Sequence, residues 1–177
     1  MNLVDYYFIK NENQLSLYLE KYIPLVLLVA QKFNIDLSNK RFTGDHLGLQ
    51  VLSNGEFNIC DKELLKFSKI IKDGEIHDRK NRLYEFNKPI QIDSITIPFI
   101  ETFEPKPNSN ISKLRAGIEH MAFVVKDYEE FYQECLNKNI PIEKRVDFDD
   151  RSSFFKTKFI NGVEIEFRTE PLKFIND

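Results

Sequence analysis

The sequence predicts an α+β fold in which a unit of one strand, one helix and three further strands occurs twice, after an N-terminal helical segment. Three observations predict this fold. Apolar residues follow a helical pattern near the N-terminus, short strand-like apolar runs follow beyond residue 40, and one short sequence occurs twice. A chain of 177 residues is long enough to bury a hydrophobic core without disulfide bonds.

The composition is that of a globular protein and argues against several classes. Apolar residues make up 42% and charged residues 30% of the chain, and the net charge of −3 comes with no long basic run, so nucleic-acid binding is not expected. The most apolar run, residues 22–30, is about half the ~20 residues that span a bilayer, so no membrane protein is expected either. The N-terminus shows no signal-peptide pattern, and two cysteines are too few for a disulfide framework. We therefore expect a cytoplasmic protein in which Cys60 and Cys135 are buried thiols.

The chain divides into four segments. Residues 1–40 form the helical segment, which we expect Pro24 to kink or divide. The first module covers 41–104, and a linker rich in Pro and Asn covers 105–115. The second module covers 116–177.

The sequence of each module predicts the same order of elements: a strand, a helix and three further strands. In the first, we expect a strand at 42–52, a helix at 61–73 that ends at Gly74, and strands around Ile76 and at 82–86 and 94–102. In the second, we expect a strand at 117–125 and a helix from Tyr128 to about Asn139, capped by Asp127 with Glu130 completing a capping box. Its last strands are expected at 142–146, 154–160 and 163–169.

The repeat places one histidine at the same position in each module. Residues 43–51, Thr-Gly-Asp-His-Leu-Gly-Leu-Gln-Val, align with residues 117–125, Gly-Ile-Glu-His-Met-Ala-Phe-Val-Val. Because side chains alternate along a strand, His46 shares a face with Gly48, and His120 shares a face with Ala122, away from the bulky apolar face. A small neighbour leaves room beside each histidine, which suits a binding site, although two hydrogen-bonded structural histidines remain the alternative.

The fourth strand of each module adds carboxylates. Glu101 ends an apolar strand of the first module, and Glu164 and Glu166 share the polar face of the last strand of the second. Two neutral imidazoles and two carboxylates suit a divalent first-row metal ion, with Zn, Ni, Co, Mn and Fe(II) as candidates.

With a histidine on the first strand and a carboxylate on the fourth strand of each module, the chain resembles the vicinal oxygen chelate superfamily, which includes glyoxalase I, extradiol dioxygenases and methylmalonyl-CoA epimerase. Residues 162–167, Gly-Val-Glu-Ile-Glu-Phe, resemble the terminal strand of that superfamily, in which the ligand Glu follows Gly by four positions. More closely, the chain resembles the bacterial YecM-like proteins over roughly residues 12–172, through Asp45-His46, Lys88-Pro-Ile-Gln and Glu119-His120.

The resemblance implies a curved, mostly antiparallel sheet around a cleft and a metal held by His46, Glu101, His120 and Glu166. It further implies an enzyme that chelates a small oxygen-rich substrate to the metal, with Glu101 and Glu166 as the catalytic carboxylates. Isomerase or lyase chemistry fits four protein ligands, and oxygenase chemistry fits if one carboxylate does not bind. We expect a monomer or a homodimer.

Two other functions stay open. The fold could bind a ligand or a metal without catalysing a reaction, or the N-terminal helices could bind a partner protein. For the substrate, Arg82 and Tyr84 share a face on the third strand of the first module, and Lys156 and Lys158 occupy the matching strand of the second. A cation there could hold a carboxylate or phosphate group, unless these side chains are simply solvated.

Overall fold

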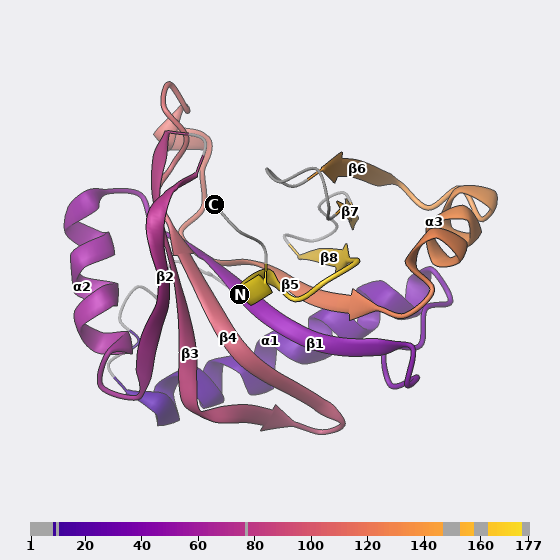
Figure 1. The fold of residues 1–177 in the computed structure, drawn as a ribbon, viewed down its shortest axis with the longest axis horizontal. Helices are drawn as coiled ribbons and strands as arrows, with labels where there is room; N and C mark the ends of the chain where they lie inside the picture. The colour runs from indigo at the N-terminus through magenta and orange to yellow at the C-terminus, as the bar shows by residue number, and fades with distance from the viewer. Residues whose placement is uncertain (1–8, 10, 77, 147–152, 158–162, 175–177) are drawn as a thin grey trace.

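The computed structural model describes residues 9, 11–76, 78–146, 153–157 and 163–174, which form one eight-stranded sheet and three α-helices (Figure 1). The helices are α1 (Glu12–Lys32), α2 (Asn54–Leu64) and α3 (Tyr128–Asn137). The strands are β1 (Phe42–Gln50), β2 (Ser68–Ile76), β3 (Arg79–Ile92), β4 (Ile95–Phe103), β5 (Gly117–Val125), β6 (Ile142–Val146), β7 (Ser153–Thr157) and β8 (Glu164–Arg168). Two short 3₁₀ helices cover Ile111–Lys113 and Leu172–Phe174.

The strand order is β2-β3-β4-β1-β5-β8-β7-β6, so each module supplies one half of the sheet with its own first strand at the centre. All neighbouring strands are antiparallel except β1 with β4 and β5 with β8. The strand directions turn from near vertical in β2 to near horizontal in β1 (Figure 1). The predicted α+β fold of two βαβββ modules in a mostly antiparallel sheet is therefore confirmed.

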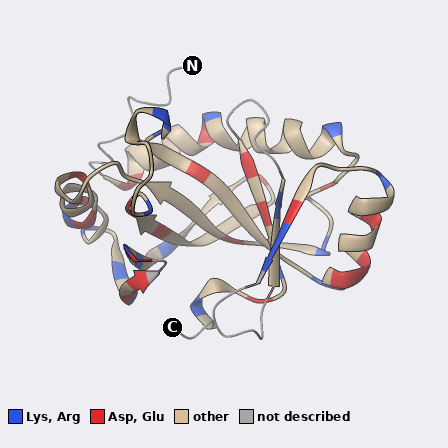
Figure 2. Cartoon of the chain, turned by 90° about the horizontal axis from the view of Figure 1, so that it is seen from above, with Lys and Arg blue, Asp and Glu red and all other residues tan. Residues whose placement is uncertain are grey.

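The core joins both modules to the N-terminal helix. One cluster of buried apolar residues contains side chains of α1, α2, α3 and the central strands, among them Tyr22, Leu47 and Phe123. Helix α1 lies behind β1 and β5 in Figure 1 and along one face of the sheet in Figure 2. No helix among the described residues is both long enough and apolar enough to cross a membrane.

Pro24 was expected to kink or divide the N-terminal helix, and it does not divide it. Helix α1 begins after Asn11, whose side chain accepts a hydrogen bond from the backbone N–H of Gln14 at 3.0 Å, and it continues through Pro24 to Lys32. Pro24 is exposed, so its ring and the carbonyl that loses a partner lie toward solvent.

The helix predicted at 61–73 is wrong in its position. Helix α2 begins after Ser53 and ends at Leu64, and residues 68–76 pair with β3 as strand β2. A capping pair fixes the start, because Glu56 N–H donates to Ser53 Oγ at 3.2 Å and the Leu52 N–H donates to the Glu56 carboxylate at 2.7 Å. Pairing with β3 outweighs the helical spacing of the apolar residues beyond Leu64, which is a weak local preference.

Helix α3 begins at Tyr128 as predicted, but the predicted capping box is absent. Asp127 adopts a left-handed conformation with φ 57° and makes no side-chain cap hydrogen bond. Its backbone carbonyl accepts instead from the N–H of Phe131 at 3.1 Å. Strands β5 and β6 have the predicted bounds, and the cysteines of α2 and α3 are buried as predicted.

Candidate metal centre

Two buried histidines meet at the centre of the sheet, where β1 pairs with β5. The Nε2 atoms of His46 and His120 are 3.2 Å apart, and the side chains are 1% and 3% exposed. Gly48 lies opposite His120 in the strand register. A Cβ atom at Gly48 would lie 2.0 Å from Cε1 of His120, so the space that the sequence predicted beside His46 is the space that the His120 ring fills.

Each central strand is irregular next to its histidine. Between Gly44 and Leu47, β1 has one residue more than β5, and between Gly48 and Leu49, β5 has the additional residue Glu119. Strict alternation would direct an acidic side chain away from the histidine that follows it, whereas a bulge can re-aim it.

The re-aimed acids hold the outer nitrogen of each imidazole. Asp45 Oδ2 lies 2.8 Å from His46 Nδ1 and also accepts a hydrogen bond from the Leu172 backbone N–H at 3.0 Å. Glu119 Oε2 lies 3.3 Å from His120 Nδ1. A carboxylate at Nδ1 favours a proton there, which would leave the Nε2 lone pair of each imidazole for a cation bound between the two rings.

Two carboxylates complete the group. In the parallel pairs, Gly48 lies opposite Glu101 and Ala122 lies opposite Glu166, so each small residue leaves space for the carboxylate of its own module. Glu101 Oε2 is 3.9 Å from both Nε2 atoms, and Glu166 Oε2 is 3.8 Å from His120 Nε2.

Three of these four residues converge closely enough to share one ion, and Glu101 is not among the three. Ligand atoms of His46, His120 and Glu166 all lie within 4.8 Å of one another, and these three residues could hold a metal ion. Ligands at about 2.0–2.2 Å from a Zn²⁺ ion are themselves roughly 3–4 Å apart, which fits the separations found. The donor set of imidazole and carboxylate suits the divalent first-row metals.

The two carboxylates have different partners. Glu166 is bonded by the Arg168 guanidinium and lies 3.3 Å from Lys156 Nζ. Burial alone would raise the pKa of Glu166, but Arg168 and Lys156 hold it well below the usual range of a carboxyl group. Glu101 accepts a hydrogen bond at 2.7 Å from the neutral amide of Asn81.

Of the residues proposed for substrate binding, Lys156 contacts this group, whereas Arg82 and Tyr84 do not. Arg82 pairs with Asp61 of α2 at 2.5 Å, and the Tyr84 hydroxyl donates to the same carboxylate at 2.8 Å. Both alternate along β3 with Leu83, which lies opposite Glu101, so they occupy the other face of the sheet. Lys158 lies outside the described residues.

Among the contacts that were not assigned from the sequence are those of Asp45, Glu119 and Asn81. The first two carried a signal, because an acid precedes the histidine in both copies of the repeat. Asn81 carried none, since its contact with Glu101 depends on the pairing of β3 with β4.

A comparison with known protein families gives a match over most of the chain. The sequence model of the family described as "YecM protein" matches residues 11–170. The chain matches no curated protein.

Solved structures share the fold. Protein EC4020, a structural genomics target, has a TM-score of 0.70 at 15% identity over 88% of this chain and 85% of that chain. Hypothetical protein BH1468 from Bacillus halodurans C-125 has a TM-score of 0.54 at 23% identity over 77% of this chain and 100% of that chain. Methylmalonyl-CoA epimerase from Mycobacterium tuberculosis has a TM-score of 0.53 at 18% identity over 73% of this chain and 87% of that chain. The chain shares its fold with this epimerase. Because the family model spans most of the sequence, the protein belongs to the YecM family.

Proposed function

We propose that the protein is a metal-dependent enzyme of the vicinal oxygen chelate type, acting on a small substrate that binds through two adjacent oxygens. One observation carries the proposal. Two buried Nε2 atoms face each other at 3.2 Å with carboxylates beside them, and each imidazole is oriented by an acid at its Nδ1.

The residues then have separate roles. His46, His120, Glu101 and Glu166 hold a divalent ion, which when bound acts as a Lewis acid that stabilises negative charge on a substrate oxygen. Glu166 stays in place because Arg168 and Lys156 fix its carboxylate. Glu101 moves the proton, since its described hydrogen bond comes from a neutral amide and its Oε2 faces the histidines. This arrangement favours isomerase or lyase chemistry.

Oxygenase chemistry is the second candidate, and one observation favours it. His46, His120 and Glu166 alone form a group of two histidines and one carboxylate, the set that holds Fe(II) in non-haem oxygenases. Glu101→Gln separates the candidates, because it should abolish isomerase activity but leave iron binding and oxygen consumption with a catechol.

Metal content tests the common core of both candidates. We would measure metals by mass spectrometry in untagged wild type, in His46→Ala/His120→Ala and in Glu164→Gln. Glu164 is a matched control because it lies on β8 near Glu166 and contacts the same Lys156 at 2.8 Å, yet is not among the converging donors. One divalent ion per chain is expected in wild type and in the control, and none in the double variant.

A folded double variant, checked by circular dichroism, that keeps one ion per chain would refute the site. If wild type takes up none of Zn, Ni, Co, Mn or Fe(II), even after reloading, the histidines are structural and the protein is a ligand-binding or scaffold protein.

A further inference from the structure

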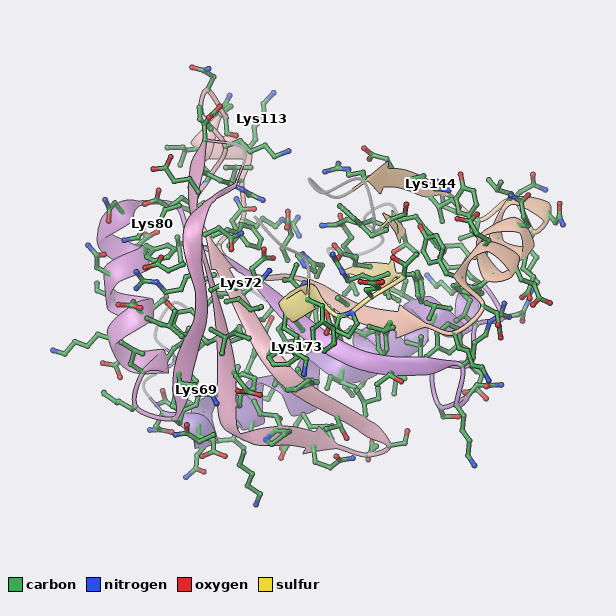
Figure 3. The ribbon with its side chains drawn as sticks, viewed as in Figure 1. Lys69, Lys72, Lys80, Lys113, Lys144 and Lys173 are labelled. Atoms are coloured by element: carbon green, nitrogen blue, oxygen red, sulfur yellow. The ribbon has the colours of Figure 1, made fainter. Side chains whose placement is uncertain are left out.

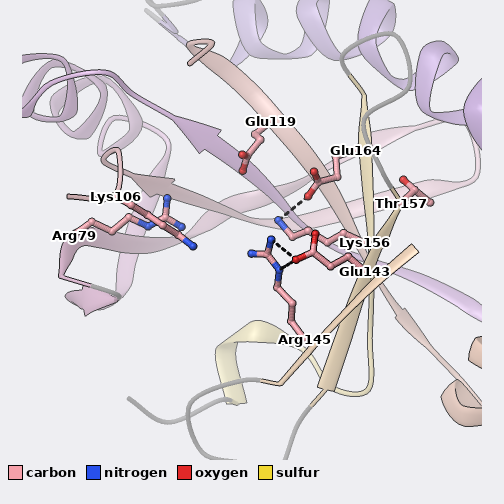
Figure 4. Close-up of a pocket in the computed structure, with 8 residues that line it drawn as sticks. All are labelled: Arg79, Lys106, Glu119, Glu143, Arg145, Lys156, Thr157 and Glu164. Carbon is pink, nitrogen blue, oxygen red and sulfur yellow. Dashed lines mark hydrogen bonds and ion pairs between the residues drawn. The ribbon is translucent and has the colours of Figure 1, made fainter. Parts of the chain in front are cut away.

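A charged pocket lies beside the metal-binding residues. It has a volume of about 430 Å³, within the range of small-molecule sites, roughly 300–1,000 Å³. Its basic residues are Arg79, Lys106, Arg145 and Lys156. Figure 4 shows Arg79 and Lys106 approaching the pocket from one side and Arg145 and Lys156 from the other.

The three carboxylates of the pocket already have partners. Glu164 lies 2.8 Å from Lys156 Nζ, Glu143 lies 2.9 Å from the Arg145 guanidinium, and Glu119 holds His120. Four basic residues face three carboxylates, so the pocket keeps an excess of one positive charge.

Arg79 and Lys106 form no ion pair with any carboxylate in the described part of the chain. The guanidinium of Arg79 donates to the Glu104 carbonyl at 3.2 Å, while its buried Nε has no hydrogen-bond partner among the described residues. Arg79 also stacks 4.3 Å from the ring centroid of Phe103, which holds the guanidinium at the pocket wall.

The positive charges oppose one another. Partial burial lowers the pKa of Lys106, the nearby charges of Arg145, Arg79 and Lys156 lower it further, and Glu119 opposes the shift. An anion in the pocket would relieve this repulsion and supply acceptors for the guanidinium and ammonium donors.

The pocket shares a wall with the candidate metal centre. Lys156 Nζ lies 3.5 Å from His120 Nδ1 and 3.3 Å from Glu166 Oε2. Phe103, which carries Arg79 on its ring, also stacks against His120 with ring centroids 6.0 Å apart. A ligand in the pocket is therefore next to the residues proposed to hold the metal.

We propose that this pocket binds the phosphate or carboxylate group of the substrate, with Arg79 and Lys106 as its principal contacts. The anion site stands on its own geometry, and its link to catalysis rests on the proposed function. Together they define the substrate class: a small oxygen-rich molecule with an anionic group at one end. Arg79 offers a fork of donors that matches two oxygens of such a group, and Lys106 adds a point charge.

Titration with inorganic phosphate, and separately with malonate, tests the proposal. Binding would be followed by calorimetry at fixed ionic strength in metal-free wild type, Lys106→Gln, Arg79→Gln/Lys106→Gln and His46→Ala/His120→Ala. Lys69→Gln is the control, because Lys69 lies on the edge strand β2 and does not line the pocket. Figure 3 labels Lys69 at its lower left. The comparison of phosphate with malonate shows which anionic group the pocket prefers.

We expect saturable binding in wild type, in the control and in the histidine variant. Lys106→Gln should weaken it, and the double substitution should weaken it by about tenfold or more. Because Lys106 is exposed, its single variant keeps the fold even if the double variant does not.

Equal binding in wild type and Lys106→Gln, or no saturable binding at all, would overturn the pocket proposal. If binding instead disappears with the histidines, phosphate sits at the metal centre, and the pocket proposal fails while the proposed function stands. If binding needs Arg79 and Lys106 but the protein takes up no metal, the pocket stands and the proposed function fails.

Discussion

The two halves of the sheet supply the same donors to the centre but surround them differently. In the first half, Glu101 is 12% exposed and bonded by a neutral amide. In the second, Glu166 is 3% exposed and bonded by the Arg168 guanidinium, with Lys156 beside it. In both halves the carboxylate lies opposite a small residue of the module's first strand.

The repeated backbone therefore fixes where each carboxylate lies, whereas the neighbouring side chains decide what it can do. A carboxylate held by two cations remains ionised and in place, which suits a permanent ligand. A carboxylate held by an amide is freer to exchange a proton or to leave the metal.

The small residues beside the histidines give the largest expected difference in metal affinity between the two halves. Gly48→Ala places a Cβ against the ring of His120, so we expect the free energy of unfolding to fall by about 1–3 kcal/mol. The displaced imidazole should also weaken metal binding by about 100-fold or more. Urea unfolding and competition with a chromogenic chelator measure the two effects.

The equivalent residue of the second half serves as the control. Ala122→Gly removes a methyl group and adds backbone freedom, which should cost about 0.5–1 kcal/mol and leave one bound ion. Unchanged metal affinity in Gly48→Ala would show that His120 does not bind in the position found here.

The same residues show what a sequence can predict. Alternation along the strands and comparison of the two copies of the repeat predicted His46, His120, Glu101 and a carboxylate of the last strand as one candidate group, and the resemblance to a known terminal strand selected Glu166 over Glu164. These are local properties, and the bounds of β5 were predicted for the same reason.

The remainder depends on contacts between distant segments. Strand β2 forms at 68–76 because it pairs with β3, although its apolar spacing also fits a helix. The bulge that turns Asp45 toward His46 exists only in the register of β1 against β5. Arg79 and Lys106 share a pocket with β7 side chains that are far away in sequence, so no spacing rule brings them together.

Neutralising each carboxylate in turn tests their division of roles. Glu166→Gln removes the charge that balances Arg168 and Lys156, so the metal-free protein should lose about 3 kcal/mol of stability. Glu101→Gln should change stability by at most about 1 kcal/mol, because an amide partner tolerates the neutral side chain. Urea unfolding after chelator treatment gives both values, and equal losses would contradict the difference between the halves.

The acids behind the histidines should have smaller and unequal effects. Asp45 is 2% exposed and lies 2.8 Å from its imidazole, whereas Glu119 is 26% exposed and lies at 3.3 Å. Asp45→Asn should weaken metal binding by about 10–100-fold, and Glu119→Gln by less than about tenfold. Metal competition assays on both variants measure this order, and a larger loss in Glu119→Gln would reverse the ranking of the two orienting acids.

The smallest expected difference between the halves is in the reactivity of the buried thiols of α2 and α3. This difference does not affect the metal centre. Burial raises the pKa of Cys60 to about 12 and that of Cys135 to about 11. Since the thiolate is the reactive form, iodoacetamide at pH 8 should alkylate both at least about tenfold more slowly in the native protein than in urea, and Cys60 more slowly than Cys135. Mass spectrometry of the two peptides measures each rate, and raising the pH toward 10 should accelerate both because more thiolate forms.

Alkylation rates in the native protein equal to those in urea would mean that the helices open often enough to expose both thiols. The packing of α2 and α3 on the sheet would then not limit the reactivity of the thiols.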